Sequence, residues 1–218
     1  MPENSPPSRD ISPLKAQRIL HILAELHPDA HCELNFSSPF QLLIATILSA
    51  QTTDKKVNAV TEKLFSCYRT PADFRSIPPA QLEKIIHEIG LFHNKAKNIL
   101  ATCRLLEEDF DGQIPRTLEE LTRLPGVGRK TANVVLANAF NIPTLAVDTH
   151  VFRVSNRLGL AHADNVSLTE EQLKTVVPVE QWIATHHRLI WHGRRVCSAR
   201  RPDCGVCALN RLCPSNLP

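Results

Sequence analysis

The chain has 218 residues, of which 43% are hydrophobic and 22% are charged. These proportions are typical of a folded globular protein with one or two domains, and they exclude a chain that is disordered over most of its length. The formal net charge of +3 is too small to indicate a nucleic-acid partner by itself, so such a partner has to be argued from where the charge lies.

Positive charge is concentrated near the C-terminus. From His186 onward there are six arginines and a single acidic residue, Asp203. The arginines are Arg188, Arg194, Arg195, Arg200, Arg201 and Arg211. This end of the chain is therefore a candidate surface for a polyanion.

Neither a membrane span nor a leader peptide is indicated. The longest strongly apolar run, residues 40–50, has about half of the roughly 20 residues that a membrane-spanning helix needs. The first twelve residues, MPENSPPSRDIS, lack the apolar stretch of a secretory signal. We therefore expect a cytoplasmic protein, in which clustered cysteines indicate a metal site rather than a disulfide framework.

Apolar residues recur at three- and four-residue spacings while glycine is scarce, which predicts an all-α protein. Ser12–Pro13 and Ser38–Pro39 are start signals for two helices. The second of these is apolar nearly all round, so we expect it to be central. Helices are predicted over residues 13–26, 40–50, 54–67, 78–89, 95–110, 168–177 and 179–193, on both sides of a glycine turn at 126–128, and within 144–159.

The turn lies in the stretch LPGVGRKTA, residues 124–132. Gly126 and Gly128 lack Cβ atoms, so the turn between the two helices can adopt positive φ and let a ligand approach the backbone closely. The amides that open the following helix carry the positive end of its dipole and suit a phosphate. An ordinary corner between two helices fits the glycine pattern equally well.

Two ionisable residues follow the turn. Lys130 lies beside Arg129 at a helix N-terminus, where both features disfavour the ammonium form, as a nucleophilic lysine requires. A solvated or phosphate-contacting lysine is the commoner role for an isolated lysine. Asp148 ends the apolar run 145–147 and is predicted to cap a helix. A functional role would require it to face Lys130 across a cleft, which spacing alone does not establish.

Four cysteines lie within CSARRPDCGVCALNRLC, residues 197–213, at gaps of six, two and five residues. Zinc sites usually show paired cysteines on separate knuckles, whereas these gaps place four thiolates around one compact object. A [4Fe-4S] cluster has this ligand set, and zinc stays open on spacing alone. The remaining cysteines, Cys32, Cys67 and Cys103, are expected to be inert thiols of the core.

Five stretches together resemble the endonuclease III family of DNA glycosylases, in the helix-hairpin-helix superfamily. They are ELNFSSPFQLLIATILSAQTTD, IGLFHNKAKNI, LPGVGRKTANVVL, AVDTHVFRV and the four-cysteine tail, and the likeness runs from about Leu14 to Cys213. The resemblance implies an all-α protein of two domains. It implies a six-helix barrel over residues 32–143 that contains the helix-hairpin-helix, and an iron–sulfur cluster domain built from residues 13–31 and 144–218. Residues 1–12 are expected to form a disordered tail.

The resemblance also implies roles for individual residues. Lys130 matches the family's catalytic lysine, and Asp148 matches its catalytic aspartate. Gln51 matches the residue that fills the gap left in the DNA helix, and Leu91 matches a wedge into the opposite strand. Without the resemblance, Gln51 reads as a helix cap and Leu91 as an ordinary hydrophobic contact. The expected phosphate contacts are Gly126, Val127, Gly128 and Arg129, and the expected ligands of a [4Fe-4S] cluster are Cys197, Cys204, Cys207 and Cys213.

The implied function is base excision repair by a bifunctional DNA glycosylase with AP lyase activity. Such an enzyme removes oxidised or ring-saturated pyrimidines from duplex DNA and cleaves the strand at the abasic site by β-elimination, through a Schiff base on Lys130. We expect a monomer in a bacterial-type cytoplasm, associated with the nucleoid. The alternatives are a monofunctional mismatch or adenine glycosylase, a noncatalytic DNA-binding module and an iron–sulfur electron carrier. Lys130 favours the bifunctional enzyme, because the mismatch and adenine relatives generally lack a lysine there.

Overall fold

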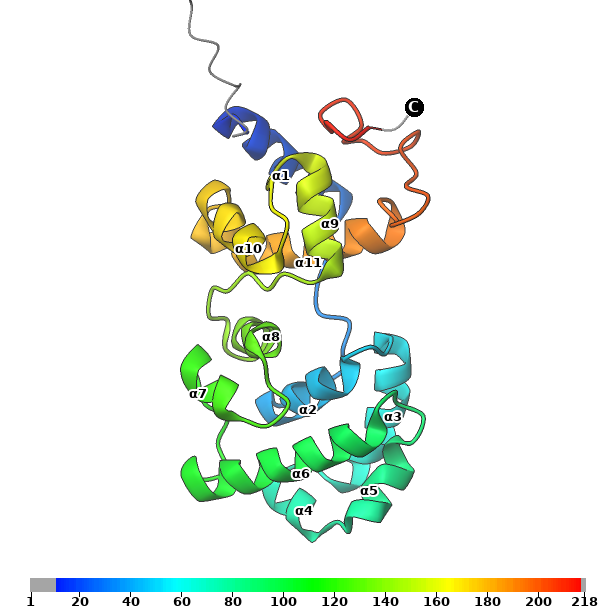
Figure 1. Ribbon diagram of the computed structural model, residues 1–218, viewed down its shortest axis with the longest axis vertical. Helices are drawn as coiled ribbons and strands as arrows, with labels where there is room; N and C mark the ends of the chain where they lie inside the picture. The colour runs from blue at the N-terminus through cyan, green and yellow to red at the C-terminus, as the bar shows by residue number, and fades with distance from the viewer. Residues whose placement is uncertain (1–10, 217–218) are drawn as a thin grey trace, which may run out of the picture. The chain divides into compact units, whose positions relative to one another are not determined.

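The computed structural model describes residues 11–216 (Figure 1). All regular secondary structure in that range is helical, which confirms the predicted all-α class. The tail expected over residues 1–12 lies outside the described residues except for Ile11 and Ser12. Among the described helices, none is long and apolar enough to cross a membrane.

The chain divides into two compact units. One contains the described residues up to His31 together with those from Leu145 onward, and the other runs from Cys32 to Thr144. The helices of the contiguous unit are α2 (Pro39–Ser49), α3 (Asp54–Cys67), α4 (Pro71–Ser76), α5 (Pro79–Ile86), α6 (Phe92–Asp109), α7 (Leu118–Arg123) and α8 (Arg129–Phe140). Those of the other unit are α1 (Pro13–Leu26), α9 (Thr149–Leu158), α10 (Val166–Val176), the 3-10 helix η1 (Val179–Gln181) and α11 (Trp182–Arg195).

Helix α2 is the centre of the contiguous unit. Ser38 Oγ accepts a hydrogen bond from Gln41 N at 3.2 Å and Pro39 follows, so the predicted start signal is confirmed. Every residue from Phe40 to Leu48 is buried, and the helix packs against α3, α6 and α8 (Figure 1). Burial on all sides explains why this segment is apolar nearly all round.

Helix α11 organises the other unit by packing against α9 and α1. The buried face of α1 presents Ile19 and Leu23, and α9 contributes Val151 and Val154. Leu189 of α11 belongs to the same core. Both ends of the described chain therefore share one hydrophobic core.

Helix α4 was not predicted from the sequence. Thr70 Oγ1 accepts from Asp73 N at 3.2 Å, while the Asp73 carboxylate accepts from Thr70 N at 2.9 Å. This reciprocal capping box stabilises a helix too short for its apolar periodicity to be visible. Pro71 at its first position is a further start signal, which apolar periodicity does not detect.

Candidate active site

The glycine turn joins α7 to α8 and is fixed to α6. Thr102 Oγ1 on α6 donates to Pro125 O at 2.8 Å, and Val127 is buried. Gly126 has a φ of +79°, and a Cβ placed on it would lie 3.0 Å from Asn98 Nδ2. The predicted need for glycine is therefore confirmed at this position by both conformation and space.

Gly128 does not use this conformational freedom, because it has a φ of −90° and a ψ of 175°. A Cβ placed on Gly128 would meet no heavy atom within 4 Å. Gly128 is the N-cap of α8 and has no side chain to accept from the first-turn amides, so these amides are directed outward for an anion.

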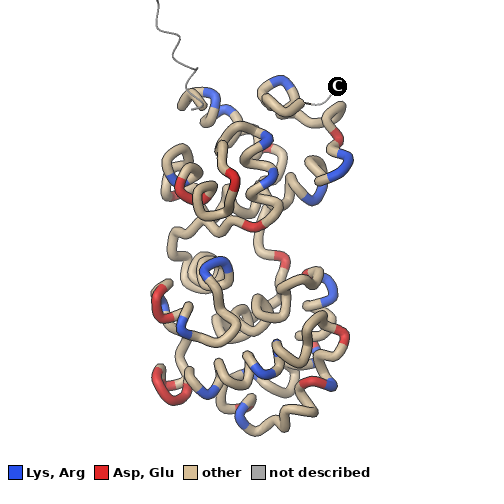
Figure 2. The backbone as a smooth tube through the Cα atoms, in the orientation of Figure 1, with Lys and Arg blue, Asp and Glu red and all other residues tan. Residues whose placement is uncertain are grey.

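Lys130 is the second residue of α8, and both it and Arg129 are exposed. Lys130 thus stands in the first turn of a twelve-residue helix whose N-cap has no side chain. Figure 2 shows the positive residues at the start of this helix. The arrangement places an amine beside a set of amide donors, which suits a substrate that is both electrophilic and anionic.

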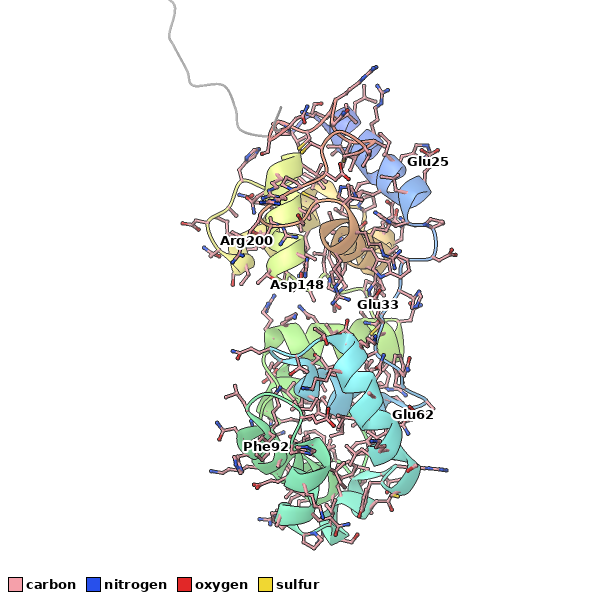
Figure 3. The ribbon with its side chains drawn as sticks, turned by 90° about the vertical axis from the view of Figure 1, so that its right-hand side faces the viewer. Glu25, Glu33, Glu62, Phe92, Asp148 and Arg200 are labelled. Carbon is pink, nitrogen blue, oxygen red and sulfur yellow. The ribbon has the colours of Figure 1, made fainter. Side chains whose placement is uncertain are left out.

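Asp148 is the N-cap of α9, as predicted (Figure 3). Its Oδ1 accepts from His150 N and from Val151 N, each at 2.8 Å. These two hydrogen bonds fix the half-buried carboxylate at the start of the helix. Burial lowers the pKa of the neighbouring His150, and Arg153 and Arg194 lower it further while Asp148 opposes them. His150 is therefore neutral at pH 7.

Gln51 and Leu91 share an uncommon backbone conformation. Gln51 follows α2 with a φ of 55°, and Leu91 precedes α6 with a φ of 59°. Few non-glycine residues other than Asn and Asp adopt this left-handed region. The helix predicted over residues 78–89 ends earlier, since α5 ends at Ile86, and the residue with positive φ that follows it is Leu91.

Both side chains are presented to solvent. Leu91 is 59% exposed, which rules out the ordinary hydrophobic contact considered for it. Gln51 is also exposed and lies beyond the end of α2. Local strain together with exposure is typical of residues that act on a ligand.

The four cysteines of the C-terminal segment line one small pocket, together with Arg157 and His192. Burial raises the pKa of the Cys207 and Cys213 thiols, and the other thiols raise it further. Because their thiolate forms repel one another, these sulfurs suit a positively charged core that would take them as thiolates. Among residues 11–216, no three His, Cys, Asp or Glu side chains form a group that could hold a single metal ion, which a cluster of four irons does not require.

Two arginines of α9 hold the cysteine segment in place. Arg157 Nη1 donates to Cys197 Sγ at 3.4 Å and to Ser198 O at 2.7 Å. Arg153 Nη2 donates to Cys197 O at 3.0 Å. Arg200, Arg201 and Arg211 instead are exposed, and Figure 2 shows Lys and Arg recurring along this segment. Arg153 and Arg157 are therefore half-buried braces, whereas Arg200, Arg201 and Arg211 are exposed charges.

Residues 44–179 match the HhH-GPD superfamily of base excision DNA repair proteins. Endonuclease III of Bacillus subtilis (strain 168) is 50% identical over 192 residues, which cover 88% of either chain. Endonuclease III of Escherichia coli (strain K12) is 51% identical over 201 residues, 91% of this chain and 95% of that protein. The chain belongs to the endonuclease III family.

Solved structures agree with this membership. The structure of a trapped endonuclease III–DNA covalent intermediate matches this chain with a TM-score of 0.91 at 48% identity. The match covers 94% of this chain and 97% of the solved one. A thermostable thymine-DNA glycosylase matches with a TM-score of 0.83 at 26% identity, covering 93% and 97%. The fold is thus common to endonuclease III and to a glycosylase of another specificity, so the activity must be argued from side chains.

Several residues of this endonuclease III family member were not predicted from the sequence. Arg153 and Arg157 brace a segment about 40 residues away, and His192 Nε2 lies 3.6 Å from Cys207 Sγ. Lys95, on α6, is buried and donates to the end of α2. The sequence carries only a weak signal for the basic residues among these, which is a Lys or Arg spaced so that it lies on the apolar face of its helix.

Proposed function

We propose that this protein is a bifunctional DNA glycosylase with AP lyase activity, which removes oxidised or ring-saturated pyrimidines from duplex DNA in base excision repair. The single observation that carries the proposal is Lys130, an exposed lysine in the first turn of α8 directly after the glycine hairpin, in a chain of the endonuclease III family. A cytoplasmic, nucleoid-associated location follows from that substrate, and we expect the protein to act as a monomer.

The proposed reaction begins with extrusion of the damaged nucleotide, because its sugar cannot be reached inside the stack. The neutral amine of Lys130 attacks C1′, the bond from C1′ to the base breaks, and the base leaves with the electron pair and takes up a proton. The C1′–O4′ bond then breaks as O4′ takes up a proton, which opens the sugar ring and leaves an iminium between C1′ and Lys130. This iminium makes C2′ acidic, so loss of the C2′ proton expels the 3′ phosphate. Water then hydrolyses the imine and frees Lys130.

Asp148 is proposed to stabilise the positive charge that develops on the sugar and to help remove the Lys130 proton. Its carboxylate is suited to a fixed position, because two main-chain amides hold one oxygen at 2.8 Å. A negative charge that needs no reorientation during the reaction stabilises the transition state more effectively than a mobile one.

The same proposal assigns the DNA contacts. The amides of Gly126, Val127, Gly128 and Arg129 would bind a backbone phosphate at the start of α8. Gln51 would enter the gap left by the extruded nucleotide, and Leu91 would wedge into the opposite strand. The exposure of both side chains supports these two assignments.

We further propose that the unit built from both chain ends is the iron–sulfur cluster domain, and that residues 32–143 form the six-helix barrel. Cys197, Cys204, Cys207 and Cys213 fit a [4Fe-4S] cluster as ligands, since all four line one cavity and Arg157 already donates to Cys197 Sγ. When bound, the cluster would supply a rigid core for the loop rather than redox turnover. Arg200, Arg201 and Arg211 would then be held at fixed positions toward phosphate.

Borohydride trapping on duplex DNA that contains one thymine glycol tests the proposal. Borohydride reduces the Schiff base to a stable covalent adduct, which we expect for the parent protein and for Lys63→Ala, an exposed lysine on α3, but not for Lys130→Ala. A parent protein that binds this duplex without ever trapping would contradict the lyase mechanism.

The thymine-DNA glycosylase match makes a monofunctional mismatch enzyme the second candidate. It would release a free base without trapping, from a G·T mismatch in place of thymine glycol. A noncatalytic binding module would do neither, so measuring free base beside the adduct separates the three functions.

A further inference from the structure

Lys95 is a buried charge with an unusual set of partners. Its Nζ donates to Leu48 O at 2.9 Å, to Ala50 O at 2.5 Å and to Thr52 Oγ1 at 3.4 Å. The residue is only 5% exposed, and these acceptors are two main-chain carbonyls and a hydroxyl. Burial lowers its pKa. Burying a lysine ammonium costs desolvation free energy, so its presence at a buried position requires an explanation.

The position of Nζ supplies part of that reason. Helix α2 ends at Ser49 and has no basic residue in its own last turn. The last carbonyls of a helix lack intrahelical partners and carry the negative end of its dipole. Lys95 reaches them from α6, so it serves as the C-terminal cation that α2 lacks.

The contacts of Lys95 also surround both strained residues. Ala50 and Thr52, whose oxygens accept from Nζ, flank Gln51 on either side. At the other end of the same residue, Lys95 N donates to Leu91 O at 3.1 Å. One residue therefore binds the neighbours of Gln51 through its side chain and Leu91 through its main chain.

The two loops also lie close to each other. A Cβ placed on Gly90 would lie 3.9 Å from Gln51 O and 4.0 Å from Thr52 Oγ1. Each left-handed residue is unfavourable by itself, and such conformations persist only where surrounding contacts over-determine them. Lys95 supplies hydrogen bonds to both loops at the point where they meet.

We propose that Lys95 is a positioning residue that holds Gln51 and Leu91 in their left-handed conformations, so that both side chains enter a gap in duplex DNA as a preformed pair. This inference rests on the DNA-contact roles given to these two residues in the proposed function. It adds that the gap-filling group and the wedge are coupled through one buried residue, by its side chain to the neighbours of Gln51 and by its main chain to Leu91. Lys95 itself touches no substrate.

The test is a double-mutant cycle on DNA affinity, which requires no chemistry. The probe is a duplex with a tetrahydrofuran abasic analogue opposite guanine, compared with the same duplex undamaged. The variants are Lys95→Met, Gln51→Ala, Leu91→Ala and the two double variants that combine Lys95→Met with either of the others. The matched control is Lys97→Met, an exposed lysine on the same helix.

We expect Lys95→Met to weaken binding to the abasic duplex about tenfold, because charge-assisted hydrogen bonds are lost, and to leave binding to undamaged duplex nearly unchanged. Each double variant should bind the abasic duplex as tightly as the weaker-binding of its two single variants. This result is expected of residues that act as one unit. Fold-losses that simply multiply, or an unchanged preference for the abasic duplex in Lys95→Met, would overturn the proposal.

If Lys95→Met fails to fold, Thr52→Val replaces it in the test. This variant keeps Lys95 and removes its most distant acceptor, together with the hydrogen bond that Thr52 Oγ1 donates to Ala50 O at 3.4 Å. It should show a smaller loss in the same direction, and no loss would count against the proposal. The outcome is separate from that of borohydride trapping. A parent protein that prefers the abasic duplex but never traps would refute the lyase mechanism while the cycle still decides the role of Lys95.

Discussion

Arg157 Nη1 on α9 donates to Cys197 Sγ at 3.4 Å, and the same side chain donates through Nη2 to Ala199 O at 2.8 Å. One guanidinium therefore holds both the first cysteine of the cavity and the main chain that follows it. The fork geometry of arginine suits this double role, which a lysine would not reproduce.

Replacing Arg157 by Met should loosen the cysteine segment. Removing charge-assisted hydrogen bonds costs about 1.5–3 kcal/mol each, so we expect a lower Tm and less iron per chain in the purified variant. Iron and sulfide content with calorimetry measures both. Arg211→Met is the control, since Arg211 is exposed. Equal iron content and Tm in the two variants would show that Arg157 does not brace the segment.

Gly126 and Gly128 should respond oppositely to alanine. At Gly126 a Cβ would meet Asn98 at 3.0 Å and the φ of +79° disfavours any side chain. We expect Gly126→Ala to cost about 1–3 kcal/mol of unfolding free energy. At Gly128 there is open space, so the cost should stay within about 0.5 kcal/mol. Urea denaturation distinguishes them, and equal losses would contradict the assignment of Gly126 as the only strained glycine of the turn.

The buried His187 predicts a loss of stability in mild acid. Burial lowers its pKa to about 3, with His186 and His31 contributing in the same direction. The unfolded chain takes up this proton near the ordinary pKa of about 6.5, so the stabilisation is complete above that pH. It should fall by up to about 1.4 kcal/mol per pH unit as the pH drops from there toward 3.

His187→Gln should flatten this dependence, which chemical denaturation at about pH 7 and about pH 5 would reveal. His21→Gln, at an exposed histidine on α1, serves as the matched control for removing a histidine. A parent protein equally stable at both pH values would contradict the burial of a neutral His187.

Arg200 and Arg201 are exposed next to the cysteines. If they contact phosphate, each reversal to Glu should lower affinity for duplex DNA and reduce the slope of log K against log salt by about one. Filter binding or fluorescence anisotropy over a salt series measures that slope. Glu62→Lys on α3 measures how much a change in net charge alone alters the affinity for duplex DNA (Figure 3). An unchanged affinity and slope after both reversals would exclude these arginines from the DNA interface.

Much of the architecture could be predicted from local signals. The serine–proline start of α2, its all-round apolar sequence and the capping role of Asp148 each depend on neighbouring residues only. What escaped prediction depends on distant partners: Lys95 donates to a carbonyl 47 positions earlier in the chain. The left-handed φ of Leu91 was missed for a similar reason, because Gly90 stood next to it as the locally favoured choice.

The unit built from both chain ends constrains how the protein can fold during synthesis. Helix α1 leaves the ribosome first, yet its buried face packs on α11, which is made more than 150 residues later. The contiguous unit between them can complete its core as soon as Thr144 has emerged. Until Leu145 and the residues after it have emerged, Ile19 and Leu23 lack the core that they share in the folded protein. The apolar face of α1 therefore waits for its partners longer than the helices of the contiguous unit do.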